Sequence, residues 1–162
     1  MKKPVWAPWR IEYIRGEKAG ECFLCRMFSE TKDRENLILF RGETCAVTMN
    51  RFPYNSGHLM VAPYRHIAEL DDLSPDEDLE FSELTKCAVV ALRSALQPEG
   101  FNIGINLGQV AGAGLEDHLH RHIVPRWNGD TNFMPVLGGP RVIPEALDAT
   151  HEVLAKEFKK LS

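Results

Sequence analysis

The most regular pattern along the chain lies in the segment 117–126, where three histidines recur at a spacing of two residues. His118, His120 and His122 cannot share one face of a helix, which repeats every 3.6 residues, whereas alternate side chains of a β-strand do share a face. The apolar pair Ile123–Val124 also favours a strand. The pattern therefore predicts a strand with three imidazoles on one face, each about 6.5 to 7 Å from the next.

Short apolar runs bounded by turn-forming residues predict further strands. These runs are Leu37–Phe40, Cys45–Met49, Leu59–Pro63 and Phe101–Leu107. The turn at 41–43 joins the first two runs in a predicted hairpin. His58 follows the turn-rich segment 50–57 and directly precedes the third run, at a junction of loop and strand where binding residues often lie.

Helical periodicity predicts a long helix that begins after Ser74 and ends near Leu96. Ser74 is a suitable N-cap residue, Pro75 occupies the first helical position, and Glu77 completes a capping box. Cys87 lies on the apolar face of this helix, so we interpret it as a core residue rather than a reactive thiol.

Two further helices are predicted, one over about Cys22–Ser29 and one over about Pro144–Lys160. His151, on the second of these, lies apart from the other histidines and is interpreted as a surface residue. Residues 1–20 form a predicted N-terminal arm, whose two tryptophans in Trp6–Arg10 dock onto the body of the protein or onto a partner subunit.

Composition limits the classes of function. A length of 162 residues is typical of a single domain, which buries about two-thirds of the surface of its unfolded chain. The formal net charge is −4 and Lys and Arg are scattered, which argues against an extended nucleic-acid surface but not against a small anion in a local pocket. No stretch has the apolar length of a signal peptide or a bilayer span, so we expect a cytoplasmic protein without a membrane partner.

The row of histidines indicates chemistry on a phosphate. An imidazole serves as nucleophile, general acid or base, metal ligand or hydrogen-bond donor near neutral pH, so the row can bind and attack one phosphate-bearing substrate. The glycine-rich segment 108–114, directly before it, allows close backbone approach to an anion. The alternative, an incidental metal-binding cluster, fits less well because the row lies within an apolar strand.

The pair Cys22-x-x-Cys25 has the spacing of half a zinc site, which imidazoles commonly complete. His66 and His118 stand at predicted strand ends, and either could face the two thiols. Two alternatives remain open, an unmetallated buried pair and a redox pair. The redox alternative is weaker because no clear βαβ pattern precedes the cysteines.

Together these motifs resemble the histidine triad (HIT) family. The run His118–Val124 is similar to the triad signature, Gly57–His58, Val61–Pro63 and His66 are similar to the family's middle motif, and Cys22–Cys25 is similar to its zinc-binding entrance.

Within the family, two flanking segments resemble the bacterial diadenosine tetraphosphate (Ap4A) phosphorylase-like branch. They are Trp6–Arg10 and Pro125–Phe133. The resemblance implies an α+β, HIT-like fold with a mostly antiparallel sheet of about five strands, one long helix and a C-terminal helix. It also implies one HIT domain over residues 1–162, with a C-terminal extension at 128–162, and assembly into a homodimer.

The resemblance implies the roles of the histidines. His120 would attack the α-phosphorus of a nucleotide and form a covalent nucleotidyl-histidine, with its neighbours holding the phosphate oxygens. His122 would contact the phosphate, and His58 would lie near the phosphates and the leaving group. His66 and His118 would bind a structural zinc ion together with the cysteine pair.

The resemblance also implies a set of nucleotide contacts. Phe23 and Leu24 match positions that line the purine pocket, although Phe23 is explained equally well as a core residue. Asn50 stands where family members hold the ribose hydroxyls. The matches on the phosphate side are Asn106, Gly112, Ala113 and Gly114.

The chain departs from the family pattern at two places. Arg121 replaces an apolar residue of the triad signature, which implies that the opposite face of the strand is partly solvated, paired with an acid or in a subunit contact, and not covered there. The segment Gly112–Leu115 lacks the usual serine, which leaves the preference for acceptor and leaving group open. Its spacing to His118, one residue longer than in hydrolase-like members, favours the phosphorylase branch.

The leading functional hypothesis is a nucleotidyl transferase that splits Ap4A or a related nucleotide, with phosphate as acceptor, into ATP and ADP. The first alternative is a hydrolase of dinucleoside polyphosphates or AMP phosphoramidates, with water as acceptor. The second is a non-catalytic nucleotide-binding module.

Overall fold

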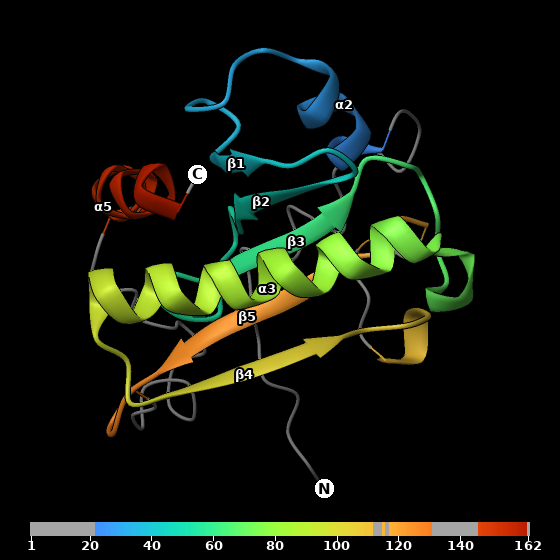
Figure 1. The fold of residues 1–162 in the computed structure, drawn as a ribbon. Coiled ribbons are helices and arrows are strands. Elements are labelled where there is room, and N and C mark those ends of the chain that lie inside the picture. The colour runs from blue at the N-terminus through green and yellow to red at the C-terminus, as the bar shows by residue number, and fades with distance from the viewer. Residues whose placement is uncertain (1–21, 112–114, 116, 131–145, 162) are drawn as a thin grey trace, which may run out of the picture.

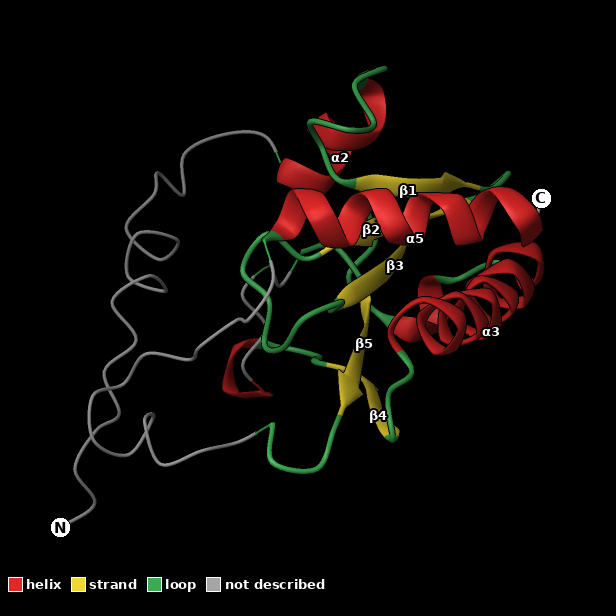
Figure 2. Ribbon diagram, turned by 90° about the vertical axis from the view of Figure 1, so that its left-hand side faces the viewer, coloured by secondary structure: helices red, strands yellow, loops and turns green. Residues whose placement is uncertain are grey.

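A five-stranded antiparallel sheet with two helices packed against it forms the framework of the protein (Figures 1 and 2). The computed structural model describes residues 22–111, 115, 117–130 and 146–161. The elements in chain order are α2 (Phe23–Ser29), β1 (Ile38–Arg41), β2 (Cys45–Met49), β3 (Leu59–Pro63), the 3-10 turn η1 (Leu70–Asp72), α3 (Pro75–Leu96), β4 (Gly100–Ile105), the 3-10 turn η2 (Gln109–Ala111), β5 (Arg121–Arg126) and α5 (Leu147–Leu161). This arrangement confirms the predicted α+β architecture.

The sheet has the strand order β1-β2-β3-β5-β4, with every neighbouring pair antiparallel. The predicted hairpin of β1 and β2 is confirmed. All residues of β2 and β3 are buried, as their continuous apolar sequences require of strands covered on both faces. The sheet thus places β3 beside β5, and with them the two segments that carry most of the predicted site.

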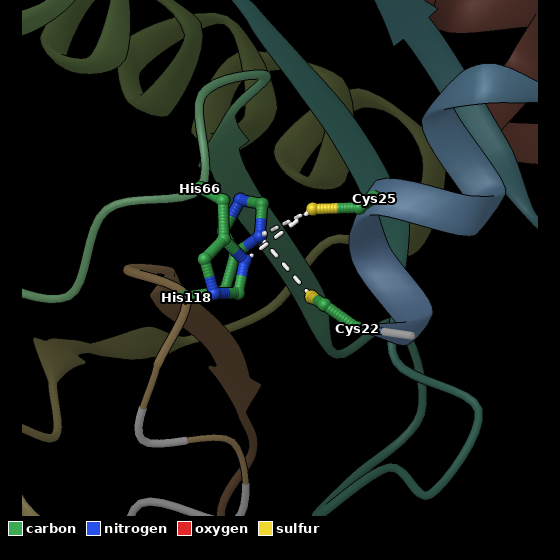
Figure 3. A group of neighbouring side chains, drawn as sticks. All are labelled: Cys22, Cys25, His66 and His118. Carbon is green, nitrogen blue, oxygen red and sulfur yellow. Dashed lines mark hydrogen bonds between the residues drawn. The ribbon is translucent and has the colours of Figure 1, made fainter. Parts of the chain in front are cut away.

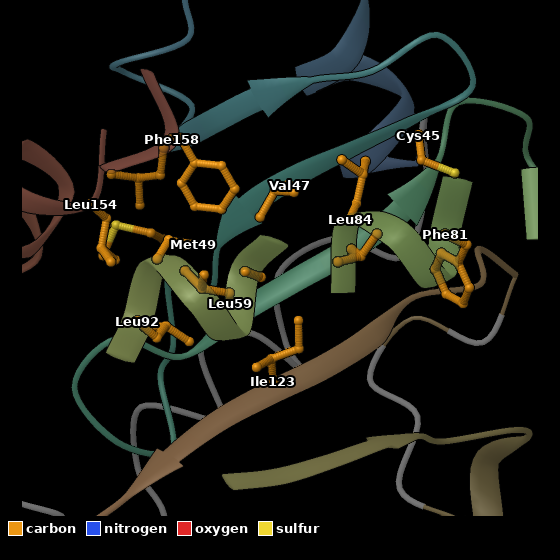
Figure 4. Close-up of a cluster of buried hydrophobic side chains, with 14 residues drawn as sticks. Cys45, Val47, Met49, Leu59, Phe81, Leu84, Leu92, Ile123, Leu154 and Phe158 are labelled. Atoms are coloured by element: carbon orange, nitrogen blue, oxygen red, sulfur yellow. The ribbon is translucent and has the colours of Figure 1, made fainter. Parts of the chain in front are cut away.

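Helix α3 crosses one face of the sheet and closes the core (Figures 1 and 4). The predicted capping box is present, because Ser74 accepts from the backbone N–H of Glu77 and the Glu77 carboxylate accepts from the backbone N–H of Ser74. The helix ends at Gln97, which has left-handed backbone angles. The core residues labelled in Figure 4 are Cys45, Val47, Met49, Leu59, Phe81, Leu84, Leu92, Ile123, Leu154 and Phe158.

Helix α5 spans Leu147–Leu161 and packs beside β1 and α3. The prediction that His151 is a surface residue is wrong. Its side chain is buried, with Nε2 3.3 Å from the carbonyl oxygen of Ile38. His151 shares one helix stripe with the buried Leu154 and Phe158, since positions three, four and seven apart lie on the same face.

The predicted strand of three histidines is wrong at its start, because β5 begins at Arg121. His118 and His120 precede the strand, and the backbone N–H of Leu119 between them bonds to the carbonyl of Ile67 instead of to a strand partner. Only His122 therefore lies within β5, and the three imidazoles do not share one strand face.

The expectation that the sheet is uncovered beside Arg121 is also wrong. The Arg121 side chain reaches α3, where its Cζ lies 4.2 Å from the centroid of the Phe81 ring. Its Nη1 also donates to Oγ1 of Thr85 at 3.0 Å. Half burial against α3 lowers the pKa of Arg121.

Three predictions fall outside the described residues: the N-terminal arm at 1–20 with Trp6–Arg10, the phosphate-side loop Gly112, Ala113 and Gly114, and the start of the last helix at Pro144. In the part of the chain that is described, no helix combines the length and the hydropathy needed to cross a bilayer.

Candidate active site and metal centre

Three separate segments bring two thiols and two imidazoles together (Figure 3). Cys22 directly precedes α2 and Cys25 lies in its first turn, so both sulfur atoms lie near the same end of that helix. His66 comes from the loop after β3 and His118 from the segment before β5. One ligand atom from each of the four residues lies within 4.8 Å of the others, a set that could hold a metal ion.

The spacing and tautomer of these residues suit zinc. Nδ1 of His118 lies 3.2 Å from the sulfur of Cys22 and 3.4 Å from that of Cys25, and Nδ1 of His66 lies 3.4 Å from Cys25. Sulfur and nitrogen ligands of a tetrahedral zinc ion stand about 3.5 Å apart. Nε2–H of His118 donates to the carbonyl of Pro63 at 2.8 Å, which directs the Nδ1 lone pair toward the two sulfur atoms.

His120 is held as the tautomer that a nucleophile needs. Its Nδ1 lies 2.8 Å from the carbonyl oxygen of His118. A carbonyl only accepts, so Nδ1 carries the hydrogen and Nε2 carries the lone pair. Burial lowers the pKa of His120, which keeps the ring neutral near pH 7. Its hydrogen-bond acceptor belongs to His118, which is also one of the four residues of the candidate metal cluster.

His122 lies beside His120, with ring centroids 4.8 Å apart and planes at 83°. Burial, with the neighbouring His120 as a further cause, lowers the pKa of His122 to about 4. His122 is therefore neutral near pH 7. Its Nδ1 lies 3.0 Å from Nε2 of His58, the histidine that precedes β3.

The hydrogen bonds determine which nitrogen of each ring carries hydrogen. Nδ1 of His58 accepts from the backbone N–H of Tyr54 at 3.1 Å, so a neutral His58 carries its hydrogen on Nε2. That Nε2–H donates to Nδ1 of His122, and the hydrogen of His122 is consequently on Nε2. Beside the lone pair of His120 the site thus offers an uncharged N–H donor.

Gly57 allows the loop before β3 to turn sharply while packing closely against α3. Its φ is +73°, in the left-handed region that glycine adopts without strain, and an added Cβ would stand 2.6 Å from a methyl group of Leu96. Close packing of this turn against α3 sets the position of the following His58.

The residues predicted to contact the nucleotide differ in their position in the fold and in their burial. Asn50, which follows β2, lies next to His58 because its backbone N–H bonds to the His58 carbonyl at 2.9 Å. Asn106 follows β4, one residue beyond the pair Ile105–Arg121. Leu24 is fully buried, whereas Phe23 is partly exposed.

Tyr54 is a residue of this site that the sequence pattern did not identify. Its ring stacks on His58 with centroids 4.8 Å apart and planes at 23°, and its centroid lies 5.9 Å from that of His122. The available signal was an aromatic residue four positions before His58 within a turn-rich segment. Periodicity carries no information about such a loop, because its side chains follow no repeat.

Comparison with known proteins identifies the family. The HIT domain model matches residues 31–129. The chain belongs to the HIT domain family. A family relative described as AP-4-A phosphorylase, from Mycobacterium tuberculosis, is 39% identical over 164 residues, which cover 96% of this chain and 84% of that protein. This finding confirms the resemblance that the histidine, glycine and cysteine motifs indicated.

Two further HIT relatives add to this picture. Adenosine 5'-monophosphoramidase hnt1 from Schizosaccharomyces pombe is 28% identical over 107 residues, which cover 67% of this chain and 77% of that protein. A Zn-bound histidine triad family protein from Mycobacterium smegmatis has a TM-score of 0.70 at 25% identity, covering 87% of this chain and 95% of that one. The solved fold of the second relative agrees with the predicted HIT-like fold.

Proposed function

We propose that this HIT protein is a nucleotidyl transferase that cleaves Ap4A, or a related nucleotide, at the α-phosphate with inorganic phosphate as acceptor. The observation that carries the proposal is the state of His120. It is buried and neutral, and its Nδ1–H is bound to the His118 carbonyl, so the lone pair stands on Nε2. A relative 39% identical along almost the whole chain is described as AP-4-A phosphorylase, which supports the choice of substrate and acceptor.

In the first step, Nε2 of His120 attacks the α-phosphorus, so that a nitrogen–phosphorus bond forms as the bond to the bridging oxygen breaks. With Ap4A the leaving group is ATP. The Nε2–H of His122 donates to a phosphate oxygen and stabilises the charge that develops there. The hydrogen bond between His58 and His122 sets the direction of that donor.

In the second step an oxygen of inorganic phosphate attacks the same phosphorus. The bond from phosphorus to His120 breaks, ADP is released, and the imidazole lone pair is restored. If water attacks instead, the product is AMP, and the protein is a hydrolase. The relative described as a monophosphoramidase supports this alternative, but its identity to this chain and the share of the chain that it covers are lower than for the phosphorylase relative.

Residues around the histidines would bind the nucleotide. Phe23 and Leu24 would line the purine pocket, and Asn50 would hold the ribose next to His58. Asn106 and the loop Gly112, Ala113 and Gly114 would donate to the phosphate oxygens from amide and backbone groups. These roles follow the family resemblance, and the position of Asn50 beside His58 supports them.

Zinc is the proposed occupant of the cluster of Cys22, Cys25, His66 and His118. Bound there it would supply no reaction chemistry but would hold α2, the loop after β3 and the segment before β5 together. Two thiolate ligands require a reducing compartment, which supports the cytoplasm as the location.

Product analysis tests the proposal. The protein is incubated with Ap4A with and without phosphate, and nucleotides are separated by chromatography. We expect ADP and ATP in equal amounts only when phosphate is present. His120→Ala lowers kcat by more than about 1,000-fold while nucleotide binding persists, because the variant loses the attacking atom and not the pocket.

Mass spectrometry of the intact protein tests the intermediate. In the absence of phosphate, the wild type is expected to gain one AMP, and the His120→Ala variant none. A rate of Ap4A turnover that does not depend on added phosphate, with AMP as a product, would favour the hydrolase. Binding without turnover across a panel of nucleotides would favour the non-catalytic module.

We also propose that the protein forms a homodimer through β4. This strand lies at the end of the strand order, its residues 102–104 are exposed, and Ile103 is 48% exposed. Exposed strand edges pair readily with another chain. Light scattering is expected to give a dimer for the wild type and a monomer for Ile103→Lys, and a wild-type monomer at micromolar concentration would contradict this proposal.

A further inference from the structure

The loop between β2 and β3 contacts His58 in two ways through one residue. The backbone N–H of Tyr54 donates to Nδ1 of His58 at 3.1 Å, and the Tyr54 ring stacks on the His58 ring at 4.8 Å and 23°. The same ring lies 5.9 Å from His122. Tyr54 thus contacts His58 and lies close to His122, the histidine beside the proposed nucleophile.

The ring of Tyr54 is not part of the apolar core. It is 39% exposed and lies outside the cluster of core side chains between the sheet and α3. The ring contact with His58 is therefore made outside the core, at the site itself.

The two contacts act on different properties of His58. The backbone N–H makes Nδ1 an acceptor and so requires that a neutral ring carries its hydrogen on Nε2. The near-parallel stack restricts rotation of the imidazole about its Cβ–Cγ bond, so that Nε2 stays directed at Nδ1 of His122, 3.0 Å away. If the ring rotated, Nδ1 of His122 would lose its donor.

We propose that Tyr54 is a positioning residue that holds His58 in the Nε2–H tautomer and thereby keeps the donor N–H of His122 on Nε2, facing the reacting phosphate. Tyr54 need not touch the substrate. The kinetic part of this inference rests on the proposed function, whereas the tautomer assignment stands on the hydrogen bonds alone.

Nitrogen NMR of histidine-labelled, full-length protein tests the assignment directly, because protonated and unprotonated ring nitrogens have distinct shifts. Near neutral pH we expect hydrogen on Nε2 in His58 and His122 and on Nδ1 in His120. Tyr54→Phe keeps the stack and is expected to match the wild type. Tyr54→Ala keeps the backbone N–H but removes the stack, so the His58 ring is free to rotate and carry Nδ1 away from that N–H. The signals of His58 and His122 are then expected to shift toward a mixture of tautomers.

Kinetics provide a second readout. For Tyr54→Ala we expect kcat to fall about 10-fold with KM changed less than about twofold, since orientation is lost while substrate contacts remain. Tyr54→Phe restores kcat to within about twofold of the wild type. A Tyr54→Leu variant carries the same test if the alanine variant does not fold.

The outcomes separate this inference from the proposed function. Unchanged tautomers in both Tyr54→Ala and Tyr54→Leu, in a protein that turns over Ap4A, would overturn the role of Tyr54 and leave the proposed function intact. A shift of the tautomers in a protein that turns over no nucleotide would support the role of Tyr54 and contradict the proposed function. A rise in KM, with kcat and the tautomers unchanged, would assign Tyr54 to substrate binding and overturn the inference.

Discussion

At the scale of single residues, burial keeps His120 and His122, two histidines of the proposed active site, neutral near pH 7. Burial lowers the pKa of His120 from its ordinary value of 6.5 and, with His120 as a further cause, lowers that of His122 to about 4. A protonated His120 has no lone pair on Nε2 and cannot attack. Lowered pKa values therefore extend the active range toward acid pH.

A pH profile tests this point. The rate constant for formation of the nucleotidyl enzyme, measured in single-turnover experiments with Ap4A, is expected to stay constant as pH falls through 6.5. It should decline only at lower pH, where His120 becomes protonated. A midpoint at or above 6.5 would show that burial does not control this histidine.

Arg121, the departure from the family signature, is explained by its partner on α3. Its guanidinium lies 4.2 Å above the Phe81 ring and donates to Thr85. A partly desolvated cation over an aromatic face is worth about 1 to 2 kcal/mol, and the methylene stem adds packing. We expect Arg121→Ala to lower the free energy of unfolding by about 2 kcal/mol, as measured by urea denaturation.

Arg93 supplies the matched control for this prediction. It is exposed on the same helix and its Cζ stands farther from a ring, 5.6 Å from Phe101. Arg93→Ala should cost only about 0.5 kcal/mol. An equal decrease in the free energy of unfolding in the two variants would show that the contact of Arg121 with Phe81 adds no stability.

The members of the candidate site could be proposed from the sequence, but their packing partners could not. Spacing and motif singled out His120, His122 and the four members of the metal cluster. The partners of Arg121, Tyr54 and His151 depend on which elements pack together, and a pattern of polar and apolar positions does not contain that information. His151 shares a helical stripe with Leu154 and Phe158, so its burial, unlike its contact with Ile38, is present in the sequence pattern.

At the scale of elements, the N-terminus of α3 depends on one carboxylate. Glu77 accepts from Nε and Nη2 of Arg65, each at 2.6 Å, and from the backbone N–H of Ser74 at 2.8 Å. The Arg65 guanidinium, first, and the Ser74 donors lower the pKa of Glu77 from its ordinary 4.5 to about 2. The capping box therefore includes an ion pair whose arginine is half-exposed.

The sign of the pH effect follows from this lowered pKa. The carboxylate stabilises the folded state fully above about pH 4.5, and that stabilisation is lost as pH falls toward about 2. Glu77→Gln should cost about 1 to 2 kcal/mol near neutral pH, a figure reduced for solvent screening of Arg65. The difference from the wild type in urea unfolding should shrink steadily below about pH 4.5.

Glu83, exposed on the same helix, is the control for Glu77. Glu83→Gln should change the free energy of unfolding by less than about 0.5 kcal/mol at any pH. A loss in Glu77→Gln that is the same at neutral and acid pH would argue that the ion pair plays no part.

The sequence predicts the boundaries of an element well where a local signal such as a helix cap marks them. It predicts them poorly where pairing with another strand sets the boundary. Ser74 and Pro75 marked the start of α3 because capping is local in sequence. The start of β5 at Arg121 was missed, because strand pairing ends where the backbone of Leu119 turns to the Ile67 carbonyl. The alternation of histidines thus continues into a segment, His118–His120, that lies before the strand.

At the scale of the whole molecule, the proposed metal centre joins segments that are far apart in sequence. Cys22 and Cys25 come from the first described element, His66 from the middle of the chain, and His118 from the approach to β5. His118 also supplies the carbonyl that accepts from Nδ1–H of His120, the proposed nucleophile. Loosening the centre is therefore expected to disturb both stability and catalysis.

Removal of zinc tests this coupling. If the ion is held at about 1,000 times its Kd, binding contributes about 4 kcal/mol, and chelation should lower Tm by about 10 °C in a protein of this size. Cys22→Ser should do the same and should lower kcat, because His118 no longer fixes the carbonyl beside His120. Calorimetry, metal analysis and turnover of Ap4A provide the measurements.

Cys87→Ala serves as the control for this thiol substitution. Cys87 lies on α3 and packs partly against the core, away from the metal ligands, so its variant should keep one zinc per chain and wild-type turnover. Zinc removal that lowers Tm but leaves the rate of nucleotidyl transfer and the Nδ1–H signal of His120 unchanged would contradict the coupling. In that case the centre would stabilise the fold without holding the nucleophile, and the orientation of His120 would depend on β3 and β5 alone.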